Sequence, residues 1–565
     1  MSQSSNIITI LQPMKLELLP VELLLCLFDY FSTNDLLKQF YHLNFHFDSL
    51  LLNYVRSHGF NFRSISKIDF DTICLKYLPN MANQIASLGL SDCENTPGQT
   101  NQFFKYGFTL SEFTHLKSLS LYGISSEQTI DRILSELSRL DHLTYLIFKQ
   151  CSFAMRDSRT RINAIWSLAK LSHCCLENSA GYFLSPTVTS SSIRSFSSCM
   201  VPVSDNDFTG LLAHTPNLRH FSIDFSFLWT FSFVFPSNML IKTLEVSLAN
   251  VNTTLLMPFL QQLHNLRRLK LRMQYCFIYG EQWEQIIKTH LPNLLLFQFR
   301  MKSAFEKENN REERIDEILD TFRSPFWLKE HCWYVRCDWS PDYGKMYLYT
   351  VPYAFQNFTF EFSVISKSTY PHKNNRRLYE TVRTLTYKPQ LSKWSIRSQI
   401  QFFNIHTLSV EFPISDFFYS MVPNLCQLMS LDVWSNDRST NSNMQLQVLL
   451  DRSPNLLSLR YRIWPSSDST QMPPYENRST SVRYLDLRYM NRCYDNEQCI
   501  ALGHSPLGRQ CEILSLSVKN ENCIFDLANT MDYLRTLNIA HNSYTQRIWS
   551  STKDELIEEV SQNKT

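Results

Sequence analysis

One pattern, found in PNLRHFSI (216–223), PNLLLFQF (292–299) and PNLLSLRY (454–461), decides the expected fold. In each stretch, Pro-Asn leads into six residues whose first, fourth and sixth positions are apolar. Alternating apolar residues are typical of a β-strand that buries one face, and the aromatic residues in these stretches also favour a strand. The pattern therefore predicts short strands, each entered through a turn.

Copies of the six-residue pattern recur along most of the chain. They begin at Ile85, Leu116, Leu143, Leu171, Ile193, Leu218, Ile241, Leu266 and Leu294, and again at Val382, Ile405, Leu428, Leu456, Val482, Cys511 and Leu534. Because 44% of the residues are hydrophobic, a single copy carries little weight. The spacing is informative, since most copies start 22 to 29 residues after the previous one. Residues between copies, such as Ile130, Ile133, Leu134 and Leu137, have the spacing of an amphipathic helix.

A unit of strand, turn and helix that repeats at this interval resembles a leucine-rich repeat. The resemblance implies an α/β solenoid, with parallel strands on the concave side and helices on the convex side. The family often has Asn or Cys just after the strand, and Cys93, Cys151, Asn436 and Asn542 occupy that place here. Other copies lack such a residue, so we expect an irregular curvature. An all-helical repeat of the HEAT type is the alternative, which the strand-like stretches disfavour.

The stretch LELLPVELLLCLFDYF (16–31) predicts a helix that begins near Pro20. Its apolar residues fall on two faces, so the helix needs cover on two sides. Two further short helices are expected between residues 32 and 54. Three helices of this size cannot bury all their apolar surface, so the following domain or another chain has to cover the rest.

The sequence Leu-Pro-x-Glu-Leu-Leu at 19–24, followed by Asp-Leu-Leu at 35–37, resembles an F-box. The resemblance implies a three-helix module that binds the Skp-type adaptor of a cullin-RING (SCF) ubiquitin ligase. The residues that it assigns to adaptor binding are Leu19, Pro20, Leu23, Leu24, Leu27, Phe28, Leu36 and Leu37. The alternative is that these helices only cap the repeats.

The repeat pattern is interrupted over residues 303–380, which we interpret as one inserted segment. A helix is expected around Ile315 to Phe322, followed by two strands on either side of a turn at 340–344. This β-hairpin is rich in Trp, Tyr and Phe, which can anchor a protein partner. Packing of the insertion against the repeats is the interpretation that we favour, and it makes Trp333 a buried residue.

These patterns predict one long repeat array with a small module attached, rather than several separate globular domains. The expected regions are a flexible N-terminus (1–14), the F-box (15–56), a connector (57–84), a first repeat block (85–302), the insertion (303–380), a second repeat block (381–545), and a C-terminal capping helix with a tail (546–565).

The composition and the motifs argue against an enzyme. Only 11 of the 565 residues are glycine, whereas nucleotide-binding loops depend on glycine. The sequence contains no GxSxG, HExxH or GxxxxGK[ST] motif. Its 15 cysteines include no CxxC pair, which argues against a zinc site. We therefore expect no catalytic, cofactor-binding or metal-binding residues.

The net charge of +2 gives no reason to expect nucleic acid or a membrane surface as the main partner. No stretch approaches the ~20 apolar residues of a membrane span, and the N-terminus lacks the pattern of a signal peptide. We expect a cytoplasmic or nuclear protein. The expected partners are the Skp-type adaptor and cullin of an SCF complex, together with a protein substrate.

Alternate residues of a leucine-rich-repeat strand face outward from the concave sheet. This rule places Arg268, Lys270 and Arg272 on one strand and Arg300 on the next. Four cations on adjacent strands predict a substrate-facing surface for an acidic or phosphorylated segment, and a solvated surface is the alternative. The predicted function is a non-catalytic substrate-recognition subunit of an SCF-type ubiquitin ligase. The alternative is a leucine-rich-repeat interaction scaffold with no link to a ligase.

Overall fold

The computed structural model describes most of the chain. The described residues are 16–31, 33–41, 43–152, 158–177, 183–199, 205–225, 239–249, 253–304, 310–340, 344–360, 365–371, 376–388, 400–415, 417–435, 441–464, 476–490, 492–541, 544–550 and 555–558. The predicted flexible N-terminus (1–14), Asn436 and Asn542 lie outside these ranges.

The first of two β-sheets has thirteen strands, and its first ten are parallel and follow the order of the chain. These are β1 (Phe60–Asn61), β2 (Ser87–Ser91), β3 (Ser118–Tyr122), β4 (Tyr145–Lys149), β5 (His173–Glu177), β6 (Ser195–Cys199), β7 (His220–Phe225), β8 (Thr243–Ala249), β9 (Arg268–Gln274) and β10 (Leu296–Ala304). Three more strands complete the sheet: β11 (Tyr334–Trp339), β12 (Lys345–Val351) and β14 (Ile365–Ser368). The sheet begins inside the predicted connector, since β1 pairs with β2.

The second sheet has nine strands, of which the first eight are parallel. They are β13 (Asn357–Phe360), β15 (Thr384–Tyr387), β16 (Thr407–Phe412), β17 (Ser430–Ser435), β18 (Ser458–Tyr461), β19 (Tyr484–Asp486), β20 (Ile513–Ser517) and β21 (Thr536–His541). The last strand, β22 (Tyr544–Trp549), runs antiparallel to β21. It occupies the start of the region that was predicted to be a C-terminal capping helix.

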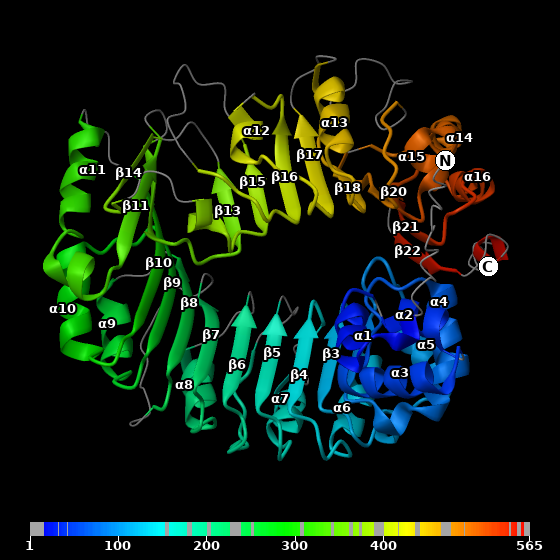
Figure 1. Cartoon of the computed structure of the whole chain (residues 1–565), viewed down its shortest axis with the longest axis horizontal. Coiled ribbons are helices and arrows are strands. Elements are labelled where there is room, and N and C mark those ends of the chain that lie inside the picture. The colour runs from blue at the N-terminus through cyan, green and yellow to red at the C-terminus, as the bar shows by residue number, and fades with distance from the viewer. Residues whose placement is uncertain are drawn as a thin grey trace, which may run out of the picture.

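Helices lie on the outer side of both sheets, and the strands line the inner side (Figure 1). The helices are α1 (Val21–Phe28), α2 (Thr33–Phe40), α3 (Phe45–His58), α4 (Lys67–Thr72), α5 (Gln99–Lys105), α6 (Glu127–Leu137), α7 (Ser158–Trp166), α8 (Asp205–Ala213), α9 (Thr253–Gln261), α10 (Gly280–His290), α11 (Arg311–Asp320), α12 (Phe417–Met421), α13 (Asn441–Asp451), α14 (Asn496–His504), α15 (Pro506–Gln510) and α16 (Asn522–Thr530). Short helical turns add η1 (Leu16–Leu18), η2 (Ile73–Tyr77), η3 (Leu78–Asn80), η4 (Ala82–Gln84), η5 (Leu110–Glu112), η6 (Phe326–Glu330), η7 (Arg376–Tyr379) and η8 (Arg488–Met490). Within the described ranges, no helix has the length and apolar character needed to cross a lipid bilayer.

The predicted α/β class and the parallel repeat strands are confirmed, and the arrangement is consistent with a leucine-rich-repeat solenoid. Alternate residues of the strands and one face of each helix fill the core between them. In α6, for example, Ile130, Ile133 and Leu137 are fully buried against the sheet. The period of 3.6 residues in the helices and of two in the strands therefore brings the apolar side chains of both into one continuous layer.

Side-chain hydrogen bonds explain why three strands are preceded by Pro-Asn. In each case the asparagine amide donates to a backbone carbonyl in the corresponding turn of the preceding repeat: Asn217 to Ser191 (2.7 Å), Asn293 to His264 (2.9 Å) and Asn455 to Cys426 (2.8 Å). Turns lack the regular backbone bonds of a sheet, so a side-chain donor is needed to satisfy such carbonyls. The motif thus ties neighbouring repeats together.

Residues 303–380 differ from the predicted insertion, because they join two sheets instead of decorating one. β10 pairs antiparallel with β12, β12 with β11, and β11 with β14, whereas β13 starts the second sheet. The physical reason lies in β12, which is apolar on both faces. Met346 and Leu348 belong to the core of the first sheet, and Tyr347 and Tyr349 belong to the core of the second.

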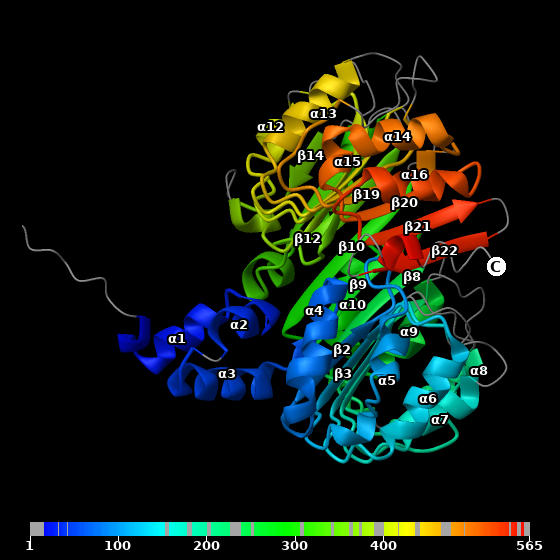
Figure 2. The same cartoon turned by 90° about the vertical axis from the view of Figure 1, so that its right-hand side faces the viewer.

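The two ends of the array lie side by side, with β21 and β22 next to α4 and α5 (Figures 1 and 2). The ring of Phe70 on α4 packs against Trp549 on β22 with centroids 5.4 Å apart, and Lys67 pairs with Glu555. No strand pairing joins the two ends of the array, since β1 and β22 are end strands of separate sheets. Side-chain contacts therefore hold the two ends together.

Candidate functional site

The first candidate surface is the N-terminal helical module, formed by α1, α2 and α3. It extends away from the sheets (Figure 2) and has a small core of its own, made by Leu24, Phe28, Leu36, Phe47, Leu50, Leu51 and Tyr54. Asn44 caps α3 by accepting a hydrogen bond from the backbone N–H of Phe47 (3.0 Å). Leu37 and Val55 join the core of the first sheet, so the module is anchored at one end.

Large apolar side chains remain exposed on this module. The most exposed are Leu18 (74%), Leu23 (54%), Tyr30 (88%), Leu43 (59%) and Phe45 (88%). Several exposed apolar side chains on so small a unit are typical of a protein-binding surface. The predicted adaptor-binding set contains Leu23 but not Leu18, Tyr30, Leu43 or Phe45, since the resemblance to an F-box assigned only positions that match its motif.

The residues predicted to bind an adaptor divide into two groups. Pro20 and Leu23 are exposed, and Leu19 and Leu27 are half-buried. The other four, Leu24, Phe28, Leu36 and Leu37, are buried within the chain itself. These four positions correct the prediction, because their side chains fill the space between the helices and cannot also contact a partner. They hold the helices of the module together beneath the exposed residues.

The second candidate surface is the inner side of the first sheet, where Arg268, Lys270, Arg272 and Arg300 lie as the strand alternation predicts. Lys270 and Arg272 are not free cations, however, because both pair with Glu245 on β8, at 3.1 and 3.5 Å. Both also lie over the ring of Phe355, and Arg300 lies over the ring of Tyr347. The prediction of four available cations is therefore wrong for Lys270 and Arg272. Sequence spacing placed the cations correctly but did not show their partners.

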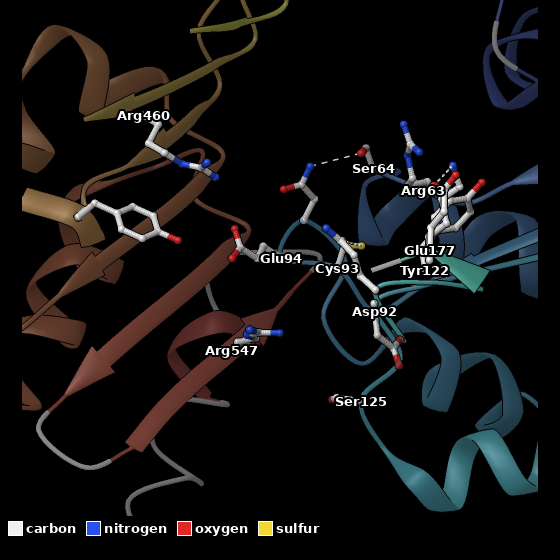
Figure 3. A pocket seen from close by; sticks show the side chains of 15 residues that line it. Arg63, Ser64, Asp92, Cys93, Glu94, Tyr122, Ser125, Glu177, Arg460 and Arg547 are labelled. Carbon is white, nitrogen blue, oxygen red and sulfur yellow. Dashed lines mark hydrogen bonds and ion pairs between the residues drawn. The ribbon is translucent and has the colours of Figure 1, made fainter. Parts of the chain in front are cut away.

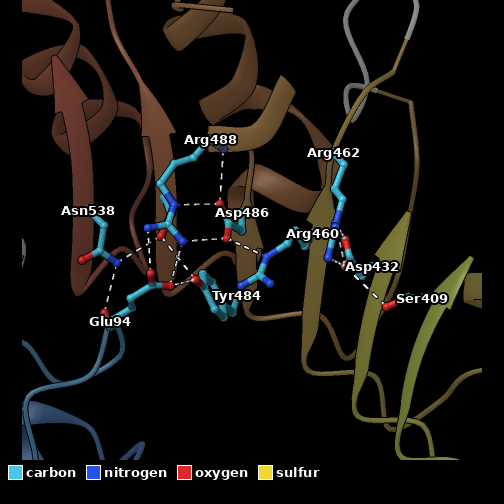
Figure 4. A network of polar contacts seen from close by, with 10 residues as sticks. Glu94, Ser409, Asp432, Arg460, Arg462, Tyr484, Asp486, Arg488 and Asn538 are labelled. Carbon is cyan, nitrogen blue, oxygen red and sulfur yellow. Dashed lines mark hydrogen bonds and ion pairs between the residues drawn. The ribbon is translucent and has the colours of Figure 1, made fainter. Parts of the chain in front are cut away.

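The inner side of the second sheet carries a connected network of ion pairs (Figure 4). Arg460 donates to the buried Asp486 at 2.9 Å, and Arg488 donates to the same carboxylate at 2.8 Å. Burial raises the pKa of the Asp486 carboxyl, but the hydrogen bonds and charges of the two arginines outweigh it, so that the pKa lies below its ordinary value. A second pair joins Arg462 to Asp432.

This network also connects the two ends of the array, a contact that we call the closure. Glu94, in the loop after β2, accepts two hydrogen bonds from Arg488, at 2.7 and 2.8 Å, and one from the Tyr484 hydroxyl at 2.7 Å. The amide of Asn538 donates to the Glu94 carbonyl at 3.0 Å. Nothing in the sequence pattern marks Glu94, because its partners lie about four hundred positions further along the chain and only the folded array brings them together.

A cavity of about 820 Å³ lies beside this closure (Figure 3). Arg63, in the turn after β1, and Tyr122 on β3 line one side of it, and Arg460 on β18, Tyr489 on η8 and Arg547 on β22 line the other. Cys93 is the only thiol in the lining, and burial raises its pKa, which keeps it protonated and a poor nucleophile. None of the described lining residues is a histidine that could serve as its base.

The described part of the chain contains no group of three or more His, Cys, Asp or Glu side chains placed to hold a metal ion. Burial raises the pKa of the Cys151 and Cys511 thiols to about 12. Such thiols pack as small apolar groups.

The chain matches no known model of a protein family, and no curated protein matches it in sequence. Among solved structures, it is similar to a chain of the TLR13–ssRNA13 complex, with 12% identity, a TM-score of 0.23, and coverage of 77% of this chain and 57% of the other. It is also similar to a chain of the yeast Rad7 and Elc1 complex, with 12% identity, a TM-score of 0.23, and coverage of 73% and 76%. The fold is therefore assigned from the strands and helices of this chain.

Proposed function

We propose that the chain is a non-catalytic substrate receptor of an SCF-type ubiquitin ligase. In this proposal, the helical module binds the Skp-type adaptor, and the repeats bind a protein substrate. The observation that carries the proposal is the position of the module outside the array, with Leu18, Leu23, Tyr30 and Phe45 exposed. Fully burying one side chain of this size against a partner contributes about 1.5–3 kcal/mol.

The resemblance to an F-box supports this choice of partner. The exposed Pro20 and Leu23 belong to the Leu-Pro-x-Glu-Leu-Leu stretch on which the resemblance rests. A cap that only covered the first repeat would bury its apolar residues against that repeat. Here Leu37 and Val55 join the core of the first sheet and Tyr41 and Leu52 pack against it, while Leu18, Leu23, Tyr30 and Phe45 stay exposed. An adaptor on the free side of the module leaves the inner face of the array open to a substrate.

The proposal also assigns no catalytic step to this chain. Ubiquitin transfer belongs to the other subunits of such a ligase, so binding surfaces are all that the receptor requires. A ligase of this kind acts in the cytoplasm or the nucleus, where the protein is expected.

Binding of the full-length chain to a purified Skp-type adaptor, measured by calorimetry, tests the proposal. Leu23→Asp is expected to weaken binding at least about tenfold, because a carboxylate buried without a partner is costly. Leu23 is exposed in the free chain, so the variant is expected to keep its fold. Leu75→Asp is the matched control, since Leu75 is also exposed (65%, against 54% for Leu23) but lies on η2, outside the module.

Two results would count against the receptor. If the wild-type chain does not bind the adaptor, an interaction scaffold without a ligase link is the better description. If Leu23→Asp and Leu75→Asp bind equally well, the adaptor does not use the exposed side of α1.

A further inference from the structure

Four cations occupy one repeat position in four successive repeats, directly before β6, β7, β8 and β9. They are Arg194, Arg219, Lys242 and Arg267. Their backbones form a ladder, in which the N–H of Arg219 donates to the carbonyl of Arg194, that of Lys242 to Arg219, and that of Arg267 to Lys242, each at 2.8 Å. Neighbouring strands are about 5 Å apart, so the four residues follow one edge of the sheet for roughly 15 Å.

Arg268, the residue after Arg267, adds a fifth cation at this edge; Lys242 is half-buried and the four arginines are exposed. We call these five residues the basic row. Within the ranges that the structure describes, none of the five side chains has an ion pair, a hydrogen bond or a ring contact. The turns that lead into these strands, 190–194, 214–219, 239–242 and 262–267, also contain no Asp or Glu. The row is therefore a local concentration of unneutralised positive charge.

The same ladder position in the second sheet shows that the row is not a requirement of the fold. The corresponding residues there include His406, Met429 and Leu457, which carry no fixed charge. Where that ladder has an arginine, the side chain often forms an ion pair or a hydrogen bond. Arg483 pairs with Glu512 at 3.6 Å and donates to the carbonyl of Thr480 at 3.1 Å. The repeat therefore tolerates neutral residues at a position that the first sheet fills with cations.

We propose that the basic row binds an extended acidic segment of a partner protein. The row is a single file of charges, and about five residues of an extended chain, at roughly 3.3 Å per residue, span its length. Carboxylates along such a segment can form charge-assisted hydrogen bonds with successive guanidinium groups. The proposal concerns the repeats alone and does not depend on adaptor binding. In the receptor proposed above, the acidic segment belongs to the substrate.

Apolar residues beside the row favour a peptide over a nucleic acid. Leu240 is exposed next to Lys242, and Leu295, which is 71% exposed, forms the rung after Arg267. Single-stranded nucleic acids bind through exposed aromatic rings as well as cations. Among the described residues from 183 to 304, the exposed large aromatic side chain is Tyr275, which lies beyond the opposite end of β9. The net charge of +2 also provides no broad field for a polyanion.

Fluorescence anisotropy with a labelled ten-residue glutamate peptide tests the proposal on the full chain. The triple variant Arg194→Gln, Arg219→Gln and Arg267→Gln is expected to bind about tenfold more weakly at low salt, and with a shallower salt dependence. The matched control is Lys105→Gln, Lys329→Gln and Arg509→Gln, which removes the same charge from exposed residues elsewhere. This control is expected to bind within about twofold of the wild type.

A charge-preserving variant keeps the test decisive if the neutral triple does not fold. Replacing Arg194, Arg219 and Arg267 with Lys is expected to retain most of the binding, since each rung keeps its cation. The proposal is overturned if the wild type does not bind the peptide at low salt, or if the two neutral triples lose binding equally. It is also overturned if a labelled ten-nucleotide RNA binds more tightly than the peptide and loses binding in the row variant. Leu23→Asp leaves peptide binding unchanged, which separates this outcome from failure of the ligase proposal.

Discussion

In the second sheet Arg460 and Arg488 pair with the fully buried Asp486, whereas Arg219 and Arg267 of the first sheet have no charged partner among the described residues. Both sets lie on or beside parallel strands of the repeats: Arg460 is on β18 and Arg488 begins η8, whereas Arg219 and Arg267 directly precede β7 and β9. They differ in what the fold places beside them. The arginines of the second sheet stand where the two ends of the array meet, and there they stabilise the closure.

This difference teaches that the number of cations on a repeat surface does not predict binding. Lys270 and Arg272 follow Arg268 of the basic row on the same strand, β9. Both already pair with Glu245 and lie over the ring of Phe355. Exposed ion pairs contribute little to stability, about 0–1 kcal/mol, but they still compete with a ligand for the same cation. The unpaired cations at the sheet edge are therefore the better candidates for recognition.

The boundary between the two sheets is expected to give the largest effect on stability. Trp333 is buried in the first core, where its ring contacts Trp327 and Phe297 and stacks on His331 with centroids 4.0 Å apart. Trp333→Ala is expected to lower the free energy of unfolding by about 3–5 kcal/mol, as measured by urea denaturation. Tyr275→Ala, at an exposed ring, serves as the control and is expected to cost less than about 0.5 kcal/mol. Equal stability of the two variants would show that residues 303–380 do not pack as part of the array.

A matched pair of arginine variants tests the comparison between the sheets directly. Arg488→Gln leaves Glu94 and the buried Asp486 without their main partner and is expected to cost about 3 kcal/mol. Arg219→Gln removes the same charge from the basic row and is expected to change stability by less than about 0.5 kcal/mol. Urea denaturation of the two variants side by side provides the measurement. Similar midpoints for both would remove the distinction between structural and available cations.

The sequence predicted the strands, the helices and their alternation because each depends on local periodicity. Pro-Asn before Leu218 and Leu456 marked true strand entries, and Arg268 and Arg300 lie on the strands where the pattern placed them. The sequence did not predict that the strands divide into two sheets. The strand at the junction, β12, is apolar on both faces, and its sequence pattern is the same as that of any fully buried strand. Contacts such as Glu94 with Arg488 join distant segments, and no local pattern encodes them.

The sequence also could not show which cations of the first sheet have acidic partners and which do not. The sequence gives the charge of a residue before a strand but not its neighbours in the fold. Glu245, for example, pairs with Lys270 and Arg272 but not with Arg268 on the same strand. The exposed side of the helical module was predicted in part, since Leu23 was assigned to the adaptor and is exposed, but Leu24 was assigned with it and is buried. Leu23 and Leu24 are adjacent and equally apolar, yet only the packing of α2 and α3 decides that Leu24 is buried.

The smallest expected effect is a dependence on pH that only the closure network should show. Burial raises the pKa of the Asp486 and Glu94 carboxyls, but hydrogen bonds from Arg488 outweigh it and hold both pKa values below their ordinary ones. A carboxyl whose pKa is lower in the folded state stabilises the fold above its unfolded pKa, about 4 for Asp and Glu. That contribution is lost as the pH falls through the folded pKa.

Thermal melting of the wild type and of Arg488→Gln between pH 7 and pH 3 measures this contribution as a difference. The gap in melting temperature is expected to stay constant down to about pH 4 and to shrink below it, because protonation of Asp486 removes the pair that the variant lacks. Burial lowers the pKa values of His173 and His331, but neither residue contacts Arg488, so their titration is expected to affect both proteins equally and to cancel in the difference. Arg219→Gln is expected to follow the wild type at every pH, since no carboxylate in the described structure depends on it. A gap that does not narrow in acid would mean that Arg488 stabilises the closure through packing and not through its charge.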